Sequence, residues 1–123
     1  MLNKVIKSLV VTTMFLSISI PVFADTWYSS SLTLPRTGSM TTTVRKATAN
    51  TQQTKVTNNA YSVYGRIDTS TGVALSSYGE HRAWESDIIT QNTGTAVGDS
   101  IEAEFKTGPY NYRTTTATIA WRP

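Results

Sequence analysis

The sequence predicts an all-β fold of about seven antiparallel strands, arranged as a sandwich or a small barrel. Apolar and polar residues alternate with a period of two near the C-terminus, which indicates strands with one face in a core and the other in water. Thr is abundant, with 22 residues in a chain of 123, and Thr, Val, Ile, Tyr and Trp favour strands. Turn signals separate the candidate strands by about 8–12 residues, which is typical of sandwiches and barrels.

The first residues have the order of a secretory signal peptide. Lys4 and Lys7 precede an apolar stretch over residues 8–20, and a small-residue cleavage site ends at Ala24. The apolar stretch is short for a membrane span, which needs about 20 residues. We therefore expect a helical leader that is cleaved before Asp25, with an uncleaved anchor as the alternative.

Removal of a leader over residues 1–24 leaves a single domain over residues 25–123, which we expect to be secreted by a bacterium. The net charge falls from +3 to +1 because the leader carries two lysines. The remaining basic residues are scattered among acids, so we expect no nucleic acid partner and no membrane contact beyond the signal peptide. The chain contains no Cys, which excludes disulfides, thiolate metal sites and cysteine nucleophiles.

The first half of the mature chain contains three candidate strand regions. Residues 27–34 are rich in strand-forming residues and end before a proline, which cannot donate to a ladder. Residues 40–48 follow, and the polar residues 49–53 then predict a connection. Residues 54–67 predict one long strand or two short ones, with Asn58-Asn59 as a bulge or turn.

The second half contains the clearest signals. Asp68–Gly72 predicts a turn because Asp starts turns and Gly supplies a positive φ. Residues 73–78 and 84–90 are two further candidate strands, and Gln91–Gly94 is a second turn. The last two strands, residues 100–106 and 114–121, show the strict alternation.

These last two strands predict the core. One face of each is apolar, and we expect its residues to be buried: Ile101, Ala103, Phe105, Ala117, Ile119 and Trp121. The opposite positions should be exposed: Glu102, Glu104, Lys106, Thr116 and Thr118. Since Phe105 is the single Phe after the leader, Trp27, Trp84 and Trp121 are expected to help fill the interior. Gly108-Pro109 between the two strands predicts a C-terminal hairpin.

The sequence Leu34-Pro35-Arg36-Thr37-Gly38 resembles the sortase sorting signal of Gram-positive cell-wall proteins. The resemblance implies cleavage after Thr37 and a position near the C-terminus, whereas these residues lie near the start of the mature chain. Cleavage there would remove nearly the whole domain. We therefore interpret the segment as the end of a strand followed by a turn.

Glu80-His81, with Glu85 and Asp87 nearby, is the one cluster with metal or acid–base potential. A catalytic zinc site requires about three protein ligands, usually with more than one His. His81 is the sole histidine of the chain. The sequence contains no Gly-x-Ser-x-Gly elbow, phosphate loop or dinucleotide fingerprint. We expect a solvated loop here, with no catalytic residue, no metal, no cofactor and no enzyme activity.

Tyr110, Asn111, Tyr112 and Arg113 form the candidate partner-binding site. They lie beside Gly108-Pro109 at the predicted hairpin tip, where no core requires two tyrosines. Tyr and Asn with a neighbouring Arg are typical of binding loops.

These observations predict a small secreted, non-enzymatic β-domain that binds an extracellular glycan, the cell wall or a protein. The alternative is a secreted bacteriocin-like antimicrobial protein, because the size, the Tyr content and the pair Trp27-Tyr28 are similar to those of small lactococcin-like bacteriocins. A third possibility is an extracellular matrix component that associates with itself through strand edges.

Overall fold

The computed structural model describes residues 26–108 and 113–123, which contain β-strands and no helix. The predicted leader over residues 1–24 and its cleavage site at Ala24 and Asp25 lie outside the described residues. The nine strands are β1 (Tyr28–Leu34), β2 (Ser39–Thr41), β3 (Arg45–Lys46), β4 (Thr51–Thr57), β5 (Val63–Thr69), β6 (Gly79–His81), β7 (Ile88–Asn92), β8 (Ser100–Thr107) and β9 (Thr115–Arg122).

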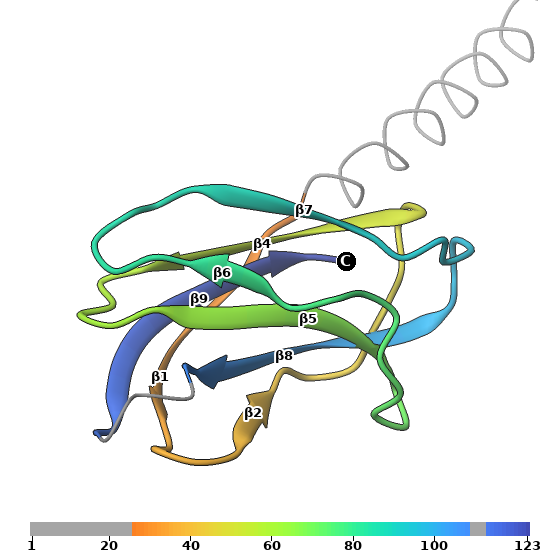
Figure 1. Ribbon diagram of the computed structural model, residues 1–123. Helices are drawn as coiled ribbons and strands as arrows, with labels where there is room; N and C mark the ends of the chain where they lie inside the picture. Colours follow the sequence, from red (N-terminus) through yellow and green to blue (C-terminus); the bar gives the residue numbers. More distant parts are fainter. Residues whose placement is uncertain (1–25, 109–112) are drawn as a thin grey trace, which may run out of the picture.

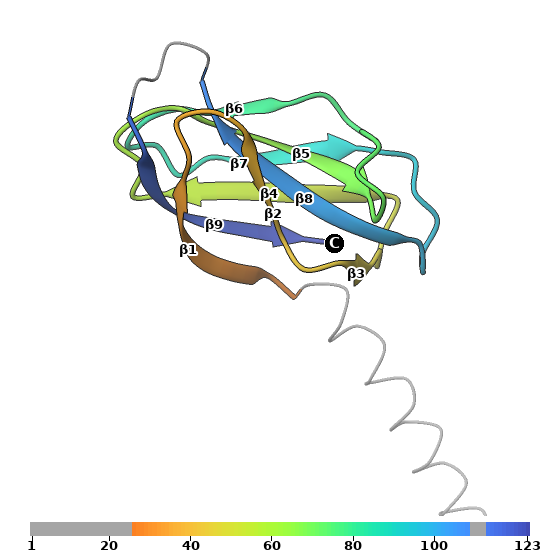
Figure 2. The same cartoon turned by 90° about the horizontal axis from the view of Figure 1, so that it is seen from below.

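The strands form two antiparallel sheets that pack face to face (Figures 1 and 2). Sheet A has the order β1-β9-β4-β7. Sheet B has the order β2-β8-β5-β6, and β3 also pairs with β8. The all-β sandwich is thus confirmed, with nine strands in place of about seven.

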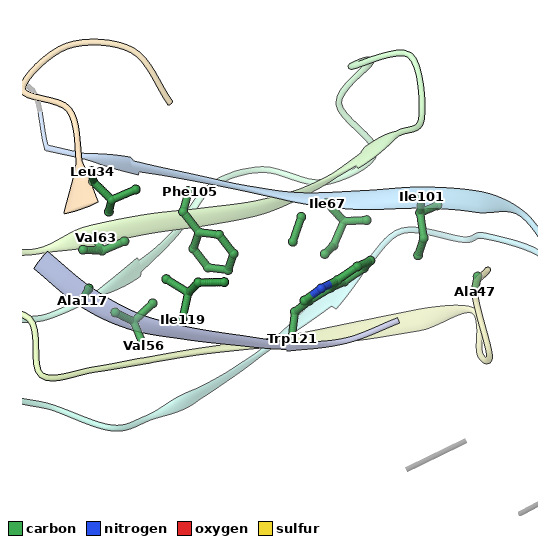
Figure 3. Packing of buried hydrophobic residues seen from close by; sticks show 11 residues of the cluster. Leu34, Ala47, Val56, Val63, Ile67, Ile101, Phe105, Ala117, Ile119 and Trp121 are labelled. Atoms are coloured by element: carbon green, nitrogen blue, oxygen red, sulfur yellow. The ribbon is translucent and has the colours of Figure 1, made fainter. Parts of the chain in front are cut away.

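The apolar faces of β8 and β9 lie in the core, as the alternation predicts. The six residues expected inside are at most 1% exposed, and the five expected outside are all more exposed than these. Figure 3 shows Phe105 and Trp121 reaching into the space between the sheets from opposite sides. Gly65 is needed opposite Phe105, because a Cβ there would lie 2.9 Å from the ring atom Cε1.

The sequence predicts two inward-facing strands only in part, because several of their buried residues are polar. β4 begins at Thr51, within the predicted connection, and its residues Gln52 and Thr54 are fully buried. Gln91 was predicted in a turn, but it lies in β7 and is 4% exposed. Its Nε2 atom donates to the carbonyl of Gly65 at 3.1 Å, which satisfies the amide inside the sandwich.

A bulge splits the predicted strand over residues 40–48 into β2 and β3. Thr41 pairs with Glu104, and Arg45 pairs with Ile101. Four steps along β2–β3 therefore oppose three steps along β8, so one residue is extra. Such bulges protect sheet edges from pairing with other chains.

The other edge of sheet B is also irregular. The predicted strand over residues 73–78 is reduced to one isolated bridge, from Ala74 to Asp68. Regular pairing resumes where Gly79 of β6 lies opposite Gly65 of β5. The chain advances five residues from Ala74 to Gly79 but only three from Asp68 to Gly65 on β5, so two residues bulge out of the ladder. The predicted turn starting at Asp68 begins two residues later, after β5 ends.

The two strands predicted to form a C-terminal hairpin belong to different sheets. β8 is a central strand of sheet B, and β9 is a central strand of sheet A. The two strands are therefore not paired with each other. The alternative of two short strands within residues 54–67 is confirmed, because β4 and β5 are separated at Asn58-Asn59 and also lie in different sheets.

Candidate functional site

The strand order brings several connections to one end of the sandwich, at the left in Figure 1. The β1–β2, β4–β5 and β6–β7 connections all lie here, because Leu34 pairs with Thr115 and Val63 pairs with both Thr107 and His81. β8 also ends here, and β9 begins here. We call this end the loop end.

Asn59 joins two connections of the loop end. It is fully buried, and its Nδ2 donates to the carbonyls of Tyr61 at 2.9 Å, His81 at 3.2 Å and Arg82 at 3.3 Å. The backbone carbonyl of Asn59 accepts a hydrogen bond from the backbone N–H of Trp84 at 3.0 Å. One buried amide thus holds the β4–β5 and β6–β7 connections against each other.

This arrangement leaves two aromatic side chains in water. Trp84 is 76% exposed and Tyr61 is 43% exposed. The prediction that Trp84 fills the core is therefore wrong, whereas Trp121 is buried and Trp27 is half-buried. Trp84 lies in a turn with φ of 62°, a left-handed conformation that is uncommon for a bulky residue and indicates a local constraint.

The predicted partner-binding site is only partly described. Tyr110, Asn111 and Tyr112 lie outside the described residues. Arg113 is exposed and makes an interaction of its own just before β9. Participation of these four residues in binding stays a prediction.

The expectation of a solvated loop at Glu80-His81 is wrong for the histidine. Glu80, Glu85 and Asp87 are exposed, but His81 is 3% exposed, and its Nε2 lies 2.9 Å from the hydroxyl of Thr54 inside the sandwich. Burial lowers the pKa of His81, and nearby Asp87 opposes this change. Within residues 26–108 and 113–123, no three His, Cys, Asp or Glu side chains gather where they could hold a metal ion.

A second set of charged residues lies on the outer face of sheet B. Arg66 on β5 is paired in register with Glu104 on β8, and its guanidinium contacts Glu104 at 2.8 Å and Asp68 at 2.7 Å. The Tyr78 ring covers this group, with the Arg66 guanidinium 4.5 Å and the Lys106 ammonium 4.1 Å from its centroid. We call Arg66, Asp68, Tyr78 and Glu104 the sheet B cluster.

The pKa values of the two carboxyl groups of the sheet B cluster are shifted in opposite directions. Asp68 is 1% exposed, and its Oδ2 atom receives no hydrogen bond from a described donor. Burial, with a hydrogen bond to Glu104, raises the pKa of Asp68 to about 7. The same hydrogen bond, aided by Ser39 and Arg66, lowers the pKa of Glu104 to about 2. Below about pH 7, Asp68 is the partner that carries the proton, whereas Glu104 is ionised.

A cavity of about 380 Å³ opens beside the sheet B cluster. Its walls come from the β1–β2 connection, from β8 and from Tyr78, and they include Arg36, Ser39, Glu104 and Lys106. The segment that resembles a sorting signal forms part of this wall. The structure confirms its interpretation as a strand end and turn, since Leu34 is a buried residue of β1 and Gly38 turns the chain with φ of 88°.

Sequence reasoning missed both of these sites. Alternation places Glu104 and Lys106 on a solvent face, but it does not show which strand lies beside them. The exposure of Trp84 had one sequence signal, the run of charged neighbours from Arg82 to Asp87. That run is more polar than a buried strand usually is.

No family model matches this chain, and a search of curated proteins finds no match. Within residues 26–108 and 113–123, no helix has the length and apolar character needed to cross a membrane.

Proposed function

We propose that the protein is a small secreted, non-enzymatic β-domain that binds an extracellular glycan, the cell wall or a protein. Trp84 and Tyr61 at the loop end form the contact surface. The observation that carries the proposal is the 76% exposure of Trp84, because a partner that covers the indole removes a large apolar surface from water. Export by a cleaved signal peptide belongs to the same proposal.

The way in which Trp84 is held also favours binding. Its backbone is tied to Asn59, which is itself fully buried, so the ring projects from a constrained turn. A constrained backbone loses little conformational entropy on binding. Trp and Tyr offer a large contact area with few rotatable bonds, which explains their frequent use in binding loops.

Replacing Trp84 by alanine should weaken binding about ten-fold while leaving the fold intact. The measurement is retention of the purified protein on peptidoglycan and on insoluble glycans, together with a thermal melt. Val97→Ala is the matched control, because Val97 is 73% exposed at the opposite end of the sandwich and should not affect retention. Retention of the Trp84 variant at the wild-type level would show that the loop end is not the contact surface.

Self-association through strand edges is a second candidate function, favoured by a difference between the two sheets. Both edges of sheet B are interrupted by bulges. In sheet A, the edge strand β1 runs over seven residues in unbroken register with β9. β1 contains no charge and no Pro, so it lacks the usual protection against pairing with a further strand.

A charge on this edge should suppress self-association. Ser30 on β1 is exposed and lies opposite Ile119, on the core-facing side of the strand. Ser30→Lys should reduce the sedimenting or fibrillar fraction at high protein concentration, because an added strand would have to cover the ammonium group. Thr116→Lys on the central strand β9 is the control and should behave as wild type. Equal association of all three proteins, or none in wild type, would contradict this candidate. The bacteriocin-like alternative stays a prediction.

A further inference from the structure

The cavity beside the sheet B cluster has walls that are held in place. Thr107 is 6% exposed, and its hydroxyl donates to the carbonyls of Pro35 at 3.3 Å and Arg36 at 3.4 Å. The hydroxyl of Ser39 donates to Glu104 Oε1 at 2.5 Å. The first contacts fasten the β1–β2 connection to β8, and the second fastens the start of β2 to β8, so the cavity lies between anchored elements.

The cavity carries an excess of positive charge. Its one carboxylate, Glu104, is already neutralised by Arg66 at 2.8 Å and bonded to Ser39. Asp68 behind it holds a proton up to about neutral pH. Both ion pairs found in the described ranges use Arg66, so the positive charges of Arg36 and Lys106 are left without a carboxylate partner there.

We propose that this cavity binds a small anionic sugar, with Arg36 and Lys106 contacting its charged group. A guanidinium and an ammonium group both bind carboxylates and phosphates, and Arg does so through two parallel hydrogen bonds. About 380 Å³ is at the lower end of the volumes typical of small-ligand sites.

Hydroxyl groups around the two cations suit the uncharged part of such a ligand. Thr37 and Tyr78 line the cavity together with Ser39. Burial raises the pKa of Tyr78 to about 12, so its hydroxyl keeps its proton and can donate a hydrogen bond to a sugar oxygen. The site is separate from Trp84, so this proposal and the proposed function can fail independently.

The test is a titration of the purified protein at pH 6 and low salt, followed by amide chemical shifts. The probes are D-glucuronate, D-glucose 6-phosphate and neutral D-glucose. We expect at least one of the two anions to bind, with millimolar affinity, and glucose to bind at least ten-fold more weakly. Binding of one anion alone identifies whether the site takes a carboxylate or a phosphate. Raising the salt concentration should weaken binding because the contacts are partly exposed.

Lys106→Gln should weaken anion binding about five-fold, since it removes one charge but keeps a polar side chain. Lys55→Gln is the matched control, because Lys55 lies on β4 of the other sheet and should leave the affinity unchanged. If Lys106→Gln does not fold, Arg36→Gln on the exposed connection tests the same charge. Equal binding of glucose and the anions, an unchanged affinity in the folded variant, or no shift with either anion would overturn the proposal.

Discussion

Phe105→Ala should lower the free energy of unfolding by about 3–5 kcal/mol, the usual cost of removing a fully buried aromatic ring. Phe105 is 0% exposed, and its ring occupies the space that Gly65 leaves on the neighbouring strand. Gly65 has no side chain that could move into the gap. The cavity should therefore stay open, which places the loss in the upper part of that range.

Denaturant melts measure this loss directly. A domain of this size is stabilised by about 5–15 kcal/mol, so the alanine variant should still be partly or fully folded in water. Thr116→Ala is the control, because Thr116 is exposed on β9 and should change stability by less than about 0.5 kcal/mol. If Phe105→Ala is too unstable to melt, Phe105→Leu should show a smaller loss in the same direction. A loss below about 1 kcal/mol for the alanine variant would show that the ring is not a core residue.

The success of the sequence prediction around Phe105 has a simple physical origin. β8 and β9 have one apolar and one polar face, so the burial of each residue can be predicted from its own type. β4 and β7 do not follow this rule, since Thr54 and Gln91 satisfy their polar groups inside the sandwich. Their strands therefore show no period of two in the sequence.

Which strands pair with one another cannot be predicted from the local sequence. A turn signal at Gly108 is equally compatible with a hairpin and with a connection that crosses to the other sheet. The sheet B cluster depends on this pairing, because Arg66 and Glu104 meet only through the register of β5 with β8. The bulged segment between Ala74 and Gly79 also leaves no signal in the sequence, and it contains Tyr78 of the cluster.

Asp68→Asn should remove a pH dependence of stability that the raised pKa of Asp68 creates. In wild type, the pKa of Asp68 is about 7 in the folded state against 3.8 in the unfolded chain, because burial and Glu104 disfavour its ionised form. The folded state therefore binds more protons between these two values. The stabilising contribution of the protonated form is complete below pH 3.8 and is lost as the pH rises through about 7.

The charged groups that face Asp68 from β5 and β8 act in opposite directions. Arg66 on the same strand favours ionisation, whereas Glu104 on β8 opposes it. Glu102 is the register partner of Asp68 on β8 and adds further negative charge above its own pKa, which burial raises. Tyr78 from the β5–β6 connection stays neutral, because its pKa is about 12. Burial and Glu104, which disfavour ionisation, outweigh Arg66, because Asp68 is nearly inaccessible to water.

The asparagine variant keeps the neutral shape of the protonated acid. Its amide can donate to Glu104, and its carbonyl can accept from Arg66, so the hydrogen bonds of the cluster survive without a titratable proton. Unfolding free energies of the two proteins should diverge as the pH rises from 5 to 8, by about 2–3 kcal/mol in favour of the variant. The lowered pKa of His81 acts with the opposite sign, because burial disfavours its charged form and makes stability fall with decreasing pH. Its contribution is common to both proteins and cancels in the difference.

Equilibrium unfolding in denaturant at pH 5, 6, 7 and 8 gives the difference directly. Glu85→Gln is the control, since it removes one exposed carboxylate near no buried partner and should follow the wild-type profile. Between pH 5 and 8, Glu104 stays ionised in the folded state, because its pKa is lowered to about 2 by the hydrogen bonds from Asp68, Ser39 and Arg66. The divergence therefore reports the proton on Asp68. Parallel profiles for wild type and Asp68→Asn across this range would mean that Asp68 is ionised throughout, and that Arg66 alone balances two buried carboxylates.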